Sequence, residues 1–245
     1  MPRFSIIVQY DGTAFRGWQL QKHERTIQGE LEKSLIKFNN NIMIRVYGAG
    51  RTDTGVHATG QVAHFDLKTN LEPIELKNAL NGHLPKDIRI MNCNLVSEKF
   101  HARFSAIKRF YLYRIRNDNF LLDRTFTWST EKLDIVRLND AAKIIKGDHD
   151  FTSFSRNNKN LEHRRCIIYE SLWKEDNEIV NYYITGNRFL HHMVRYLVGT
   201  MVEVSRKKIR FEKFKELIEN PSENAKIFKA PPQGLVLYKV DYANN

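Results

Sequence analysis

Apolar and polar residues in the first half of the chain follow the periods of short strands and helices. A short apolar run over residues 4–9 predicts a strand. Thr26 opens a helical run, in which one face carries Ile27, Leu31, Leu35 and Phe38. Further strands are predicted over residues 42–47, 61–67, 88–96 and 106–116, and a short helix over residues 74–80.

The second half repeats this rhythm. Helices are predicted over residues 138–146, 189–204 and 211–219, the last of them ended by Asn220 and Pro221. Strands are predicted over residues 165–173, 179–185 and 235–241, and an acidic turn joins the first two as an antiparallel pair. The sequence therefore predicts an α+β fold with two similar halves, each an antiparallel sheet backed by helices, and an active-site cleft between them.

The boundary between the halves is predicted where these patterns are interrupted. Asp118, Asn119 and Asp123 follow the predicted strand that ends at residue 116. We therefore expect an N-terminal α+β domain over residues 1–118 and a C-terminal α+β domain over residues 119–245, which carries the helix predicted at 189–204.

The composition is that of a globular protein, with 42% hydrophobic and 27% charged residues in a chain of 245. No run approaches the roughly 20 apolar residues that a membrane-spanning helix needs, and the first ten residues lack the pattern of a signal peptide. Cys93 and Cys166 lie far apart, which makes a thiolate zinc site unexpected. We expect a cytoplasmic protein with no membrane partner.

The net charge of +11 favours a polyanionic partner such as a nucleic acid. A solvated basic surface is the alternative that charge alone leaves open. Arg114 and Arg116 stand two residues apart in the predicted strand 106–116, so they lie on one side of it. They are candidates for contacts with RNA phosphates.

The segment GAGRTDTGVHA, residues 48–58, is the most informative part of the chain. Two glycines after a predicted strand suggest the GxGxxG motif of dinucleotide-binding proteins. However, Asp53 stands where the third glycine would be, and its carboxylate would repel a pyrophosphate. No helical pattern follows, and the Gly-Lys-Ser/Thr ending of a phosphate-binding loop is absent as well. The segment does not fit a nucleotide-binding loop.

What the loop offers is one carboxylate among glycines, with Arg51 two residues before Asp53. A neighbouring guanidinium lowers the pKa of a carboxyl group, and an ionised carboxylate suits a nucleophile or charge stabiliser better than a general acid. Loop aspartates commonly cap turns instead. The loop by itself leaves both interpretations open.

The same segment closely resembles the signature of the tRNA pseudouridine synthase A family. Other segments resemble landmarks of that family in the same order along the chain. They are YDGTAFRGWQ at 10–19, FHARFSA at 100–106, RFYLYRI at 109–115, GDHDFTSF at 147–154, GNRFLHHMVR at 186–195 and APPQGLVL at 230–237. The resemblance therefore spans nearly the whole chain.

The resemblance assigns roles to particular residues. The family's nucleophilic aspartate falls on Asp53, and its active-site tyrosine falls on Tyr111, which Arg109 precedes. Its active-site arginine in the HMVR segment falls on Arg195, and Arg51 matches the arginine ahead of the aspartate. Catalytic roles are thus expected for Asp53, Tyr111 and Arg195, and substrate contacts for Arg51, Arg109, Tyr111, Arg114 and Arg116.

The resemblance also implies an activity. Members of the family convert uridine to pseudouridine in the anticodon stem-loop of tRNA, at uridines 38, 39 and 40, and work as homodimers without cofactor or metal. The reaction breaks the N1–C1′ bond, turns the uracil and rejoins it through C5, and the target base must first be flipped out of its stack. Asp53 either attacks the sugar or takes a proton from it to give a glycal-like intermediate. Tyr111 stacks under the uracil, and Arg195 pairs with Asp53.

Two other classes of function compete with this interpretation. A non-catalytic RNA-binding protein needs no carboxylate beside phosphates, and a metal-dependent nuclease needs clustered carboxylates, which the sequence lacks in a matching context. EDTA would inactivate such a nuclease and leave an isomerase active. His191 and His192 adjoin in a predicted helix, where neighbours point to different sides, so no shared metal is expected. His57 and His64 are expected to form hydrogen bonds or to face RNA.

Overall fold

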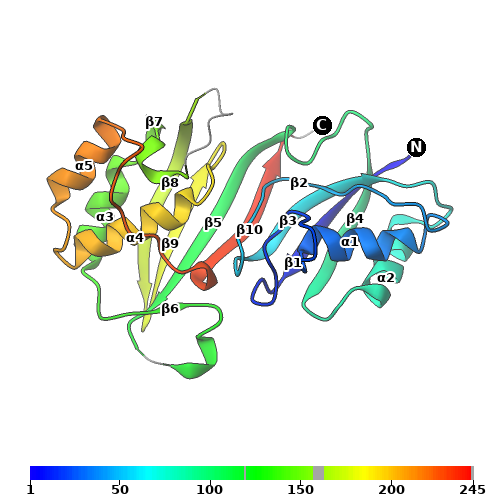
Figure 1. Cartoon of the computed structure of the whole chain (residues 1–245), viewed down its shortest axis with the longest axis horizontal. Helices are drawn as coiled ribbons and strands as arrows, with labels where there is room; N and C mark the ends of the chain where they lie inside the picture. The colour runs from blue at the N-terminus through cyan, green and yellow to red at the C-terminus, as the bar shows by residue number, and fades with distance from the viewer. Residues whose placement is uncertain (119, 157–162, 244–245) are drawn as a thin grey trace. The chain divides into compact units, whose positions relative to one another are not determined.

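The computed structural model describes residues 1–118, 120–156 and 163–243 (Figure 1). It divides into two compact units, of which the first combines Met1–Ile107 with Val236–Asn245 and the second spans Lys108–Leu235. Among the described residues, no helix has the length and apolar character needed to cross a membrane.

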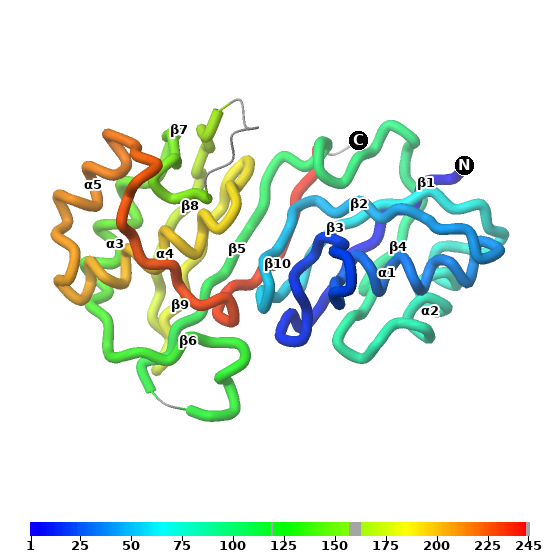
Figure 2. The backbone as a smooth tube through the Cα atoms, in the orientation of Figure 1, coloured from blue at the N-terminus to red at the C-terminus, as the bar shows by residue number. Residues whose placement is uncertain are grey.

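The first unit is built on an antiparallel sheet. Its strands are β1 (Arg3–Tyr10), β2 (Tyr47–Gly48), β3 (His57–Asp66), β4 (Ile88–Val96) and β10 (Leu235–Tyr242), and its helices are α1 (Ile27–Ile36) and α2 (Pro73–His83). β1 lies between β3 and β4 and is antiparallel to both. β2 and β10 pair with the other edge of β3, β2 antiparallel and β10 parallel to it. Figure 2 shows the red end of the chain running beside β3.

The strands of the second unit pair with one another mainly in antiparallel fashion. Its strands are β5 (Ala106–Arg116), β6 (Trp128–Ser129), β7 (Gly147–Asp150), β8 (Arg165–Asp176) and β9 (Ile179–Gly186), and its helices are α3 (Ile135–Ile144), α4 (Met193–Ser205) and α5 (Phe211–Glu219). Three short 3-10 helices are η1 (Leu121–Asp123), η2 (Thr152–Phe154) and η3 (Pro232–Gly234). β9 pairs with β5 and β8, and β8 also pairs with β7.

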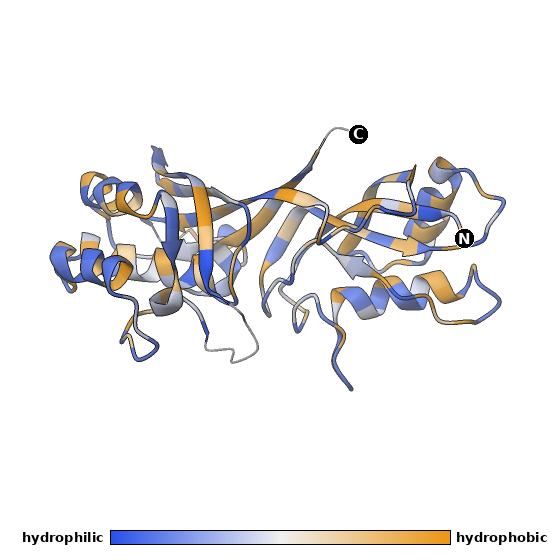
Figure 3. Ribbon diagram, turned by 90° about the horizontal axis from the view of Figure 1, so that it is seen from above, coloured by the Kyte–Doolittle hydropathy of each residue, from blue (hydrophilic) through white to orange (hydrophobic). Residues whose placement is uncertain are grey.

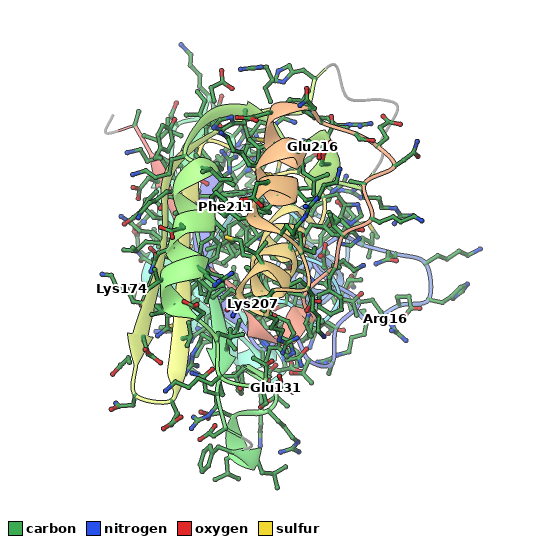
Figure 4. The ribbon with its side chains drawn as sticks, turned by 90° about the vertical axis from the view of Figure 1, so that its left-hand side faces the viewer. Arg16, Glu131, Lys174, Lys207, Phe211 and Glu216 are labelled. Atoms are coloured by element: carbon green, nitrogen blue, oxygen red, sulfur yellow. The ribbon has the colours of Figure 1, made fainter. Side chains whose placement is uncertain are left out.

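The helices are amphipathic and pack on the sheets through their apolar sides. Figure 3 shows apolar and polar residues side by side along the helices. Figure 4 views the second unit from its side, with α5 marked by Phe211 and Glu216 and with Lys174 on β8. In the first unit, α1 begins where the sequence predicts, because the Thr26 side chain accepts a hydrogen bond from the Gly29 N–H.

Both units attach a helix, in the same way, to a part of a strand that has a neighbouring strand on one side only. The side-chain amide of Asn81 on α2 donates to the carbonyl oxygen of Ile90 on β4 and accepts from its N–H, at 2.8 Å in both cases. Asn139 on α3 forms the same two bonds with Trp173 on β8, at 3.1 and 3.0 Å. These bonds satisfy backbone groups that an outer strand would leave unpaired. The prediction of an α+β fold with two similar halves, each an antiparallel sheet with helices, is confirmed.

The sequence predicts a single boundary after residue 118, whereas the structure divides the chain after Ile107 and again after Leu235. The second unit begins at Lys108, and the last strand belongs to the first unit because Val236 and Leu237 pair with His57 and Ala58 on β3. Patterns along the chain cannot reveal such a return, since they carry only local information. Asn119, at the predicted boundary, lies outside the described residues.

The prediction of a strand over residues 42–47 is wrong except at Tyr47, the first residue of β2. Val46 is buried, but its N–H donates to the Glu32 carboxylate at 3.0 Å and its carbonyl accepts from the Gln28 side chain at 3.2 Å. Side chains of α1 thus bind the backbone groups that would otherwise pair with a strand. Val46 therefore lies buried without belonging to a strand.

Candidate active site

The glycine-rich loop connects β2 to β3 in the first unit. The Gln61 side chain donates to the Gly50 carbonyl oxygen at 2.8 Å and fixes the start of the loop. The loop then turns at Asp53, whose carbonyl oxygen accepts from the Val56 N–H at 3.1 Å. Gly55 has a φ of 76°, in the left-handed region that glycine adopts without strain. Asp53, which is half-buried, therefore stands on a turn of fixed backbone.

The segment YDGTAFRGWQ, residues 10–19, holds this loop in place through hydrogen bonds to Thr52. The hydroxyl groups of Tyr10 and Thr52 form a buried hydrogen bond of 2.8 Å. The Trp18 N–H donates to the Thr52 carbonyl oxygen at 3.1 Å. Thr52 is thus held through both its side chain and its backbone, and it is the residue directly before Asp53.

At Gly12 the segment 10–19 comes very close to the backbone of Val56 in the glycine-rich loop. A Cβ atom at this position would overlap the carbonyl oxygen of Val56, so only glycine fits without movement of the loop. The Gly12 N–H also donates to Nδ1 of His57 at 3.0 Å. His57 is buried, as is His64, whose Nδ1 accepts from the Ala102 N–H at 3.1 Å. Both histidines therefore form hydrogen bonds, one of the two roles expected for them.

Arg51 stands two residues before Asp53 and is one of the residues for which the resemblance implies a substrate contact. Within the described part of the chain, no ion pair joins the two side chains, and Arg51 is exposed. Thr52 between them is buried and hydrogen-bonded to Tyr10, whereas Arg51 is exposed and Asp53 is half-buried. The exposed guanidinium is accessible to a phosphate.

Tyr111 lies in β5 of the second unit, on the face of the sheet that is buried. Its ring is 7% exposed and meets the Phe189 ring edge-on, with centroids 5.1 Å apart and planes at 82°. Arg109 lies on the same face, two residues earlier, and donates from Nη1 to the Asn187 carbonyl oxygen at 2.6 Å. The segment after β9 thus holds both residues.

Arg195 lies in the first turn of α4 and is 8% exposed. Its Nε donates to the Ala230 carbonyl oxygen at 2.8 Å, and the Ala230 N–H donates back to the Arg195 carbonyl oxygen at 3.0 Å. Burial raises the pKa of Tyr113, and the nearby charge of Arg195 opposes that effect. The guanidinium is therefore positioned by the backbone of the segment that precedes η3.

The helix predicted over residues 189–204 begins only at Met193, and His191 and His192 lie in the turn before it. His192 has a φ of 67°, a left-handed conformation that starts α4 abruptly. The two imidazole rings stack, with centroids 3.9 Å apart. The argument that the two side chains point to different sides of a helix is therefore wrong, because neither residue is helical.

Arg114 and Arg116 lie on the opposite face of β5 from Tyr111, as the alternation of strand residues requires. Arg116 is already paired, with Asp118 at 2.6 Å and Asp123 at 2.6 Å. Arg114 is half-buried and has Asn181 of β9 as its cross-strand neighbour. Of the two, Arg114 fits a phosphate contact better, because the charge of Arg116 is compensated within the protein.

Three residues of this arrangement had no role assigned from the sequence. Tyr10 lies in the segment 10–19, Thr52 stands between Arg51 and Asp53, and Phe189 lies in a segment that was expected to be helical. The sequence holds no signal for the Tyr10–Thr52 hydrogen bond, because the two residues are 42 positions apart. Asp53 and Arg51 belong to the first unit, and Arg109, Tyr111, Arg114, Arg116 and Arg195 belong to the second.

Comparison with known proteins identifies relatives of the whole chain. A family model described as tRNA pseudouridine synthase matches residues 6–105 and 141–243. The tRNA pseudouridine synthase A of Ehrlichia chaffeensis is 41% identical over 245 residues, which covers 98% of this chain and 100% of that protein. The protein of the same name from a Geobacillus strain is 39% identical over 246 residues, covering 99% of each chain. A chain in a crystal structure of a Cbf5-Nop10-Gar1 complex matches with a TM-score of 0.33 and 11% identity over 81% of this chain and 53% of its own, too weak a likeness for an argument.

Proposed function

Because this chain belongs to the tRNA pseudouridine synthase family and isomerises uridine in tRNA, we propose that it acts on uridines 38, 39 and 40 of the anticodon stem-loop and that Asp53 is its essential carboxylate. The observation that carries the proposal is the turn at Asp53. A half-buried carboxylate follows Thr52, which is fixed through its hydroxyl and its carbonyl oxygen. Such rigidity is what a group that must meet one sugar carbon requires.

Two routes of reaction are open to the Asp53 carboxylate. In the first, it attacks C1′ of the ribose, and the electrons of the N1–C1′ bond pass to the uracil. The uracil turns, C5 attacks C1′, the carboxylate leaves again, and C5 loses its proton. In the second, the carboxylate takes the proton from C2′ of the ribose while the N1–C1′ electrons leave with the uracil, which gives a glycal-like intermediate. C5 of the turned uracil then adds to C1′, the carboxyl group returns its proton to C2′, and C5 loses its own proton. Neither route changes the oxidation state or consumes water, so the reaction needs no cofactor.

We assign supporting roles to Tyr111 and Arg195. The Tyr111 ring is fixed edge-on against Phe189 and can stack under the uracil while the base turns. It is also a candidate acceptor of the C5 proton. Arg195 is a buried cation whose Nε is held by a backbone carbonyl oxygen, and a buried cation needs a counter-charge. We propose that it serves Asp53 in this way.

We propose that basic side chains bind the phosphates around the target uridine. The net charge of +11 supports a polyanionic substrate. Arg51 is exposed on the loop that carries Asp53, and Arg109 is fixed by the Asn187 carbonyl oxygen on the Tyr111 face. Arg114 on the other face of β5 would contact a different part of the tRNA.

The family resemblance also supports a homodimer in the cytoplasm, with one tRNA contacting both subunits. Light scattering on the purified protein would test the first point, since a monomer at micromolar concentration would contradict it. Fractionation of cells would test the second.

The proposed target is tested with an unmodified tRNA transcript that carries uridine at positions 38, 39 and 40. After incubation with the protein alone, pseudouridine is mapped by carbodiimide treatment and primer extension. Signals at these positions and at no other uridine are expected. Signals elsewhere would contradict the proposed positions, and none at all would contradict the activity. EDTA should leave the signals unchanged.

A further inference from the structure

Four aromatic side chains of the first unit form one continuous group, which we call the aromatic platform: Tyr47, His64, His101 and Phe104. The Tyr47 ring stacks on His64 at 5.1 Å with an angle of 19° between the planes. His101 meets the His64 ring at 4.6 Å and the Phe104 ring at 4.4 Å. The platform therefore runs from a buried imidazole to the protein surface.

The outer end of the platform is open to solvent. Phe104 is 76% exposed, the highest value among the exposed large hydrophobic side chains of the described residues, and Tyr47 is 46% exposed. The Arg103 guanidinium lies over the Phe104 ring, 5.5 Å from its centroid. An exposed aromatic ring that continues a group of stacked rings and lies beside an arginine offers the surface that a ligand with a flat ring and a negative charge would use.

The platform is rigid before any ligand arrives. Nδ1 of His101 accepts from the N–H groups of Arg103 and Phe104, at 3.1 and 3.3 Å, and the His101 N–H donates to Oγ of Ser105 at 3.0 Å. His64 is held by the Ala102 N–H. Because backbone groups fix both imidazoles, binding to the platform orders few side chains, which favours affinity.

The imidazoles of the platform are neutral at physiological pH. Burial lowers the pKa of His64 to about 4, and the charges of His101 and Arg3 act in the same direction. Burial also lowers the pKa of His101, with the charges of Arg3 and Arg103 adding to the effect. Uncharged rings stack on a base without desolvating a buried cation.

We propose that the aromatic platform binds an unpaired nucleobase of the tRNA substrate, separate from the uridine that is isomerised, with the base stacked on Phe104 and its phosphate near Arg103. This inference rests on the proposed action on tRNA. Aromatic rings beside arginine are the usual means of binding unpaired bases in RNA. Tyr47 is the first residue of β2, which leads directly into the loop of Asp53, so the platform is built into the same part of the chain as the reactive carboxylate.

A second copy of this chain is the competing occupant, because aromatic and arginine side chains are also frequent in protein interfaces. The RNA base is favoured by charge. The platform ends at Arg103, so a contact of this patch with the same patch on a second copy would bring two guanidinium groups together.

The test compares variants at Phe104 in binding an unmodified tRNA transcript by fluorescence anisotropy. Phe104→Ala and Phe104→Leu should each raise Kd by about 5- to 150-fold, the range for one stacked base. Phe104→Trp should stay within about threefold of wild type, since it keeps an aromatic face. Leu95→Ala, at a position 55% exposed in β4 of the same unit, is the matched control and should bind normally.

Three results would overturn the proposal. The first is a Phe104→Ala variant that binds tRNA as wild type does. The second is a Phe104→Leu variant as tight as wild type, which would show that only apolar area matters. The third is a Phe104→Ala variant that light scattering shows to have lost its dimers while each subunit binds tRNA as tightly as before. That result would assign the platform to a second copy of the chain.

The same samples separate this inference from the proposed function. The rate of pseudouridine formation in a single turnover at saturating protein should fall no more than about threefold in Phe104→Ala, because the platform binds substrate and takes no part in the chemistry. A wild-type protein that forms no pseudouridine would refute the proposed function. A wild-type protein that forms it while Phe104→Ala binds normally would refute the platform alone.

Discussion

The hydroxyl group of Tyr10 lies 2.8 Å from that of Thr52, and this buried hydrogen bond ties the end of β1 to the residue that precedes Asp53. Through the backbone, this bond holds the residue next to the carboxylate that we propose to be essential. We therefore propose that Tyr10 is a positioning residue, which holds the loop without belonging to it.

Tyr10→Phe should lower the single-turnover rate about 10- to 100-fold and leave the Kd for tRNA nearly unchanged, since small errors in the placement of reacting groups are costly. The matched control is Tyr182→Phe, which removes a buried hydroxyl pair of 2.9 Å with Ser171 in the second unit. Both variants should lose about 1 kcal/mol of stability. Equal rates in the two variants would show that Tyr10 acts only on stability.

A second prediction concerns the contact between Gly12 and Val56. Gly12→Ala places a methyl group on the Val56 carbonyl oxygen and must displace the loop. The single-turnover rate should then fall at least about tenfold, since a small displacement of a reacting group lowers the rate by this much or more. Gly82→Ala is the control, because a Cβ there meets nothing within 4 Å on α2 and should add about 0.5–1 kcal/mol of stability. Normal activity in Gly12→Ala would show that the loop tolerates movement.

A third prediction separates the two arginines of β5. The logarithm of tRNA affinity should fall with the logarithm of salt concentration with a slope steeper than about −3. Arg114→Gln should reduce the size of this slope by about one unit, whereas Arg116→Gln should not change it, since Arg116 is paired with Asp118 and Asp123. Equal effects of the two substitutions would mean that RNA displaces those carboxylates. A change in the uridine modified would mean that Arg114 reads more than a phosphate.

Stability should depend on pH through His64. Its pKa is about 4 in the folded protein and near 6.5 when unfolded, so the unfolded chain binds the extra proton between these values. This contribution is complete above pH 6.5 and is lost as the pH falls toward 4. From pH 7.5 to pH 5 it amounts to about 2 kcal/mol. Urea unfolding of wild type and His64→Gln should show a smaller loss in the variant; equal losses would contradict a neutral, buried His64.

The sequence predicts those elements whose signals are local. Thr26 starts α1 through its own side chain, and α5 ends before Asn220 and Pro221 as expected. Contacts between residues that are distant in the sequence could not be predicted from these local patterns. Apolar residues around Val46 predict a strand, yet the backbone partners of Val46 are side chains of α1, and β10 returns to pair with β3.

The candidate site shows the same limit. Composition and spacing give a basic chain with one carboxylate among glycines, and only the resemblance of whole segments implies a catalytic role for Asp53. The buried support that Tyr10 gives to Thr52 comes from a residue 42 positions away along the chain. Such a contact is a tertiary property, and residue spacing does not encode it.

The most direct test of the role of Asp53 is the single-turnover rate of Asp53→Asn on an unmodified tRNA transcript, measured beside its affinity. Asparagine keeps the size of the side chain and removes its negative charge. We predict a rate at least about 1,000-fold below wild type, with a Kd for tRNA within about threefold, while Asp140→Asn, on the surface of α3 beside Lys143, retains full activity. An Asp53→Asn rate of one tenth of wild type or more would contradict the assignment of Asp53 as the essential carboxylate.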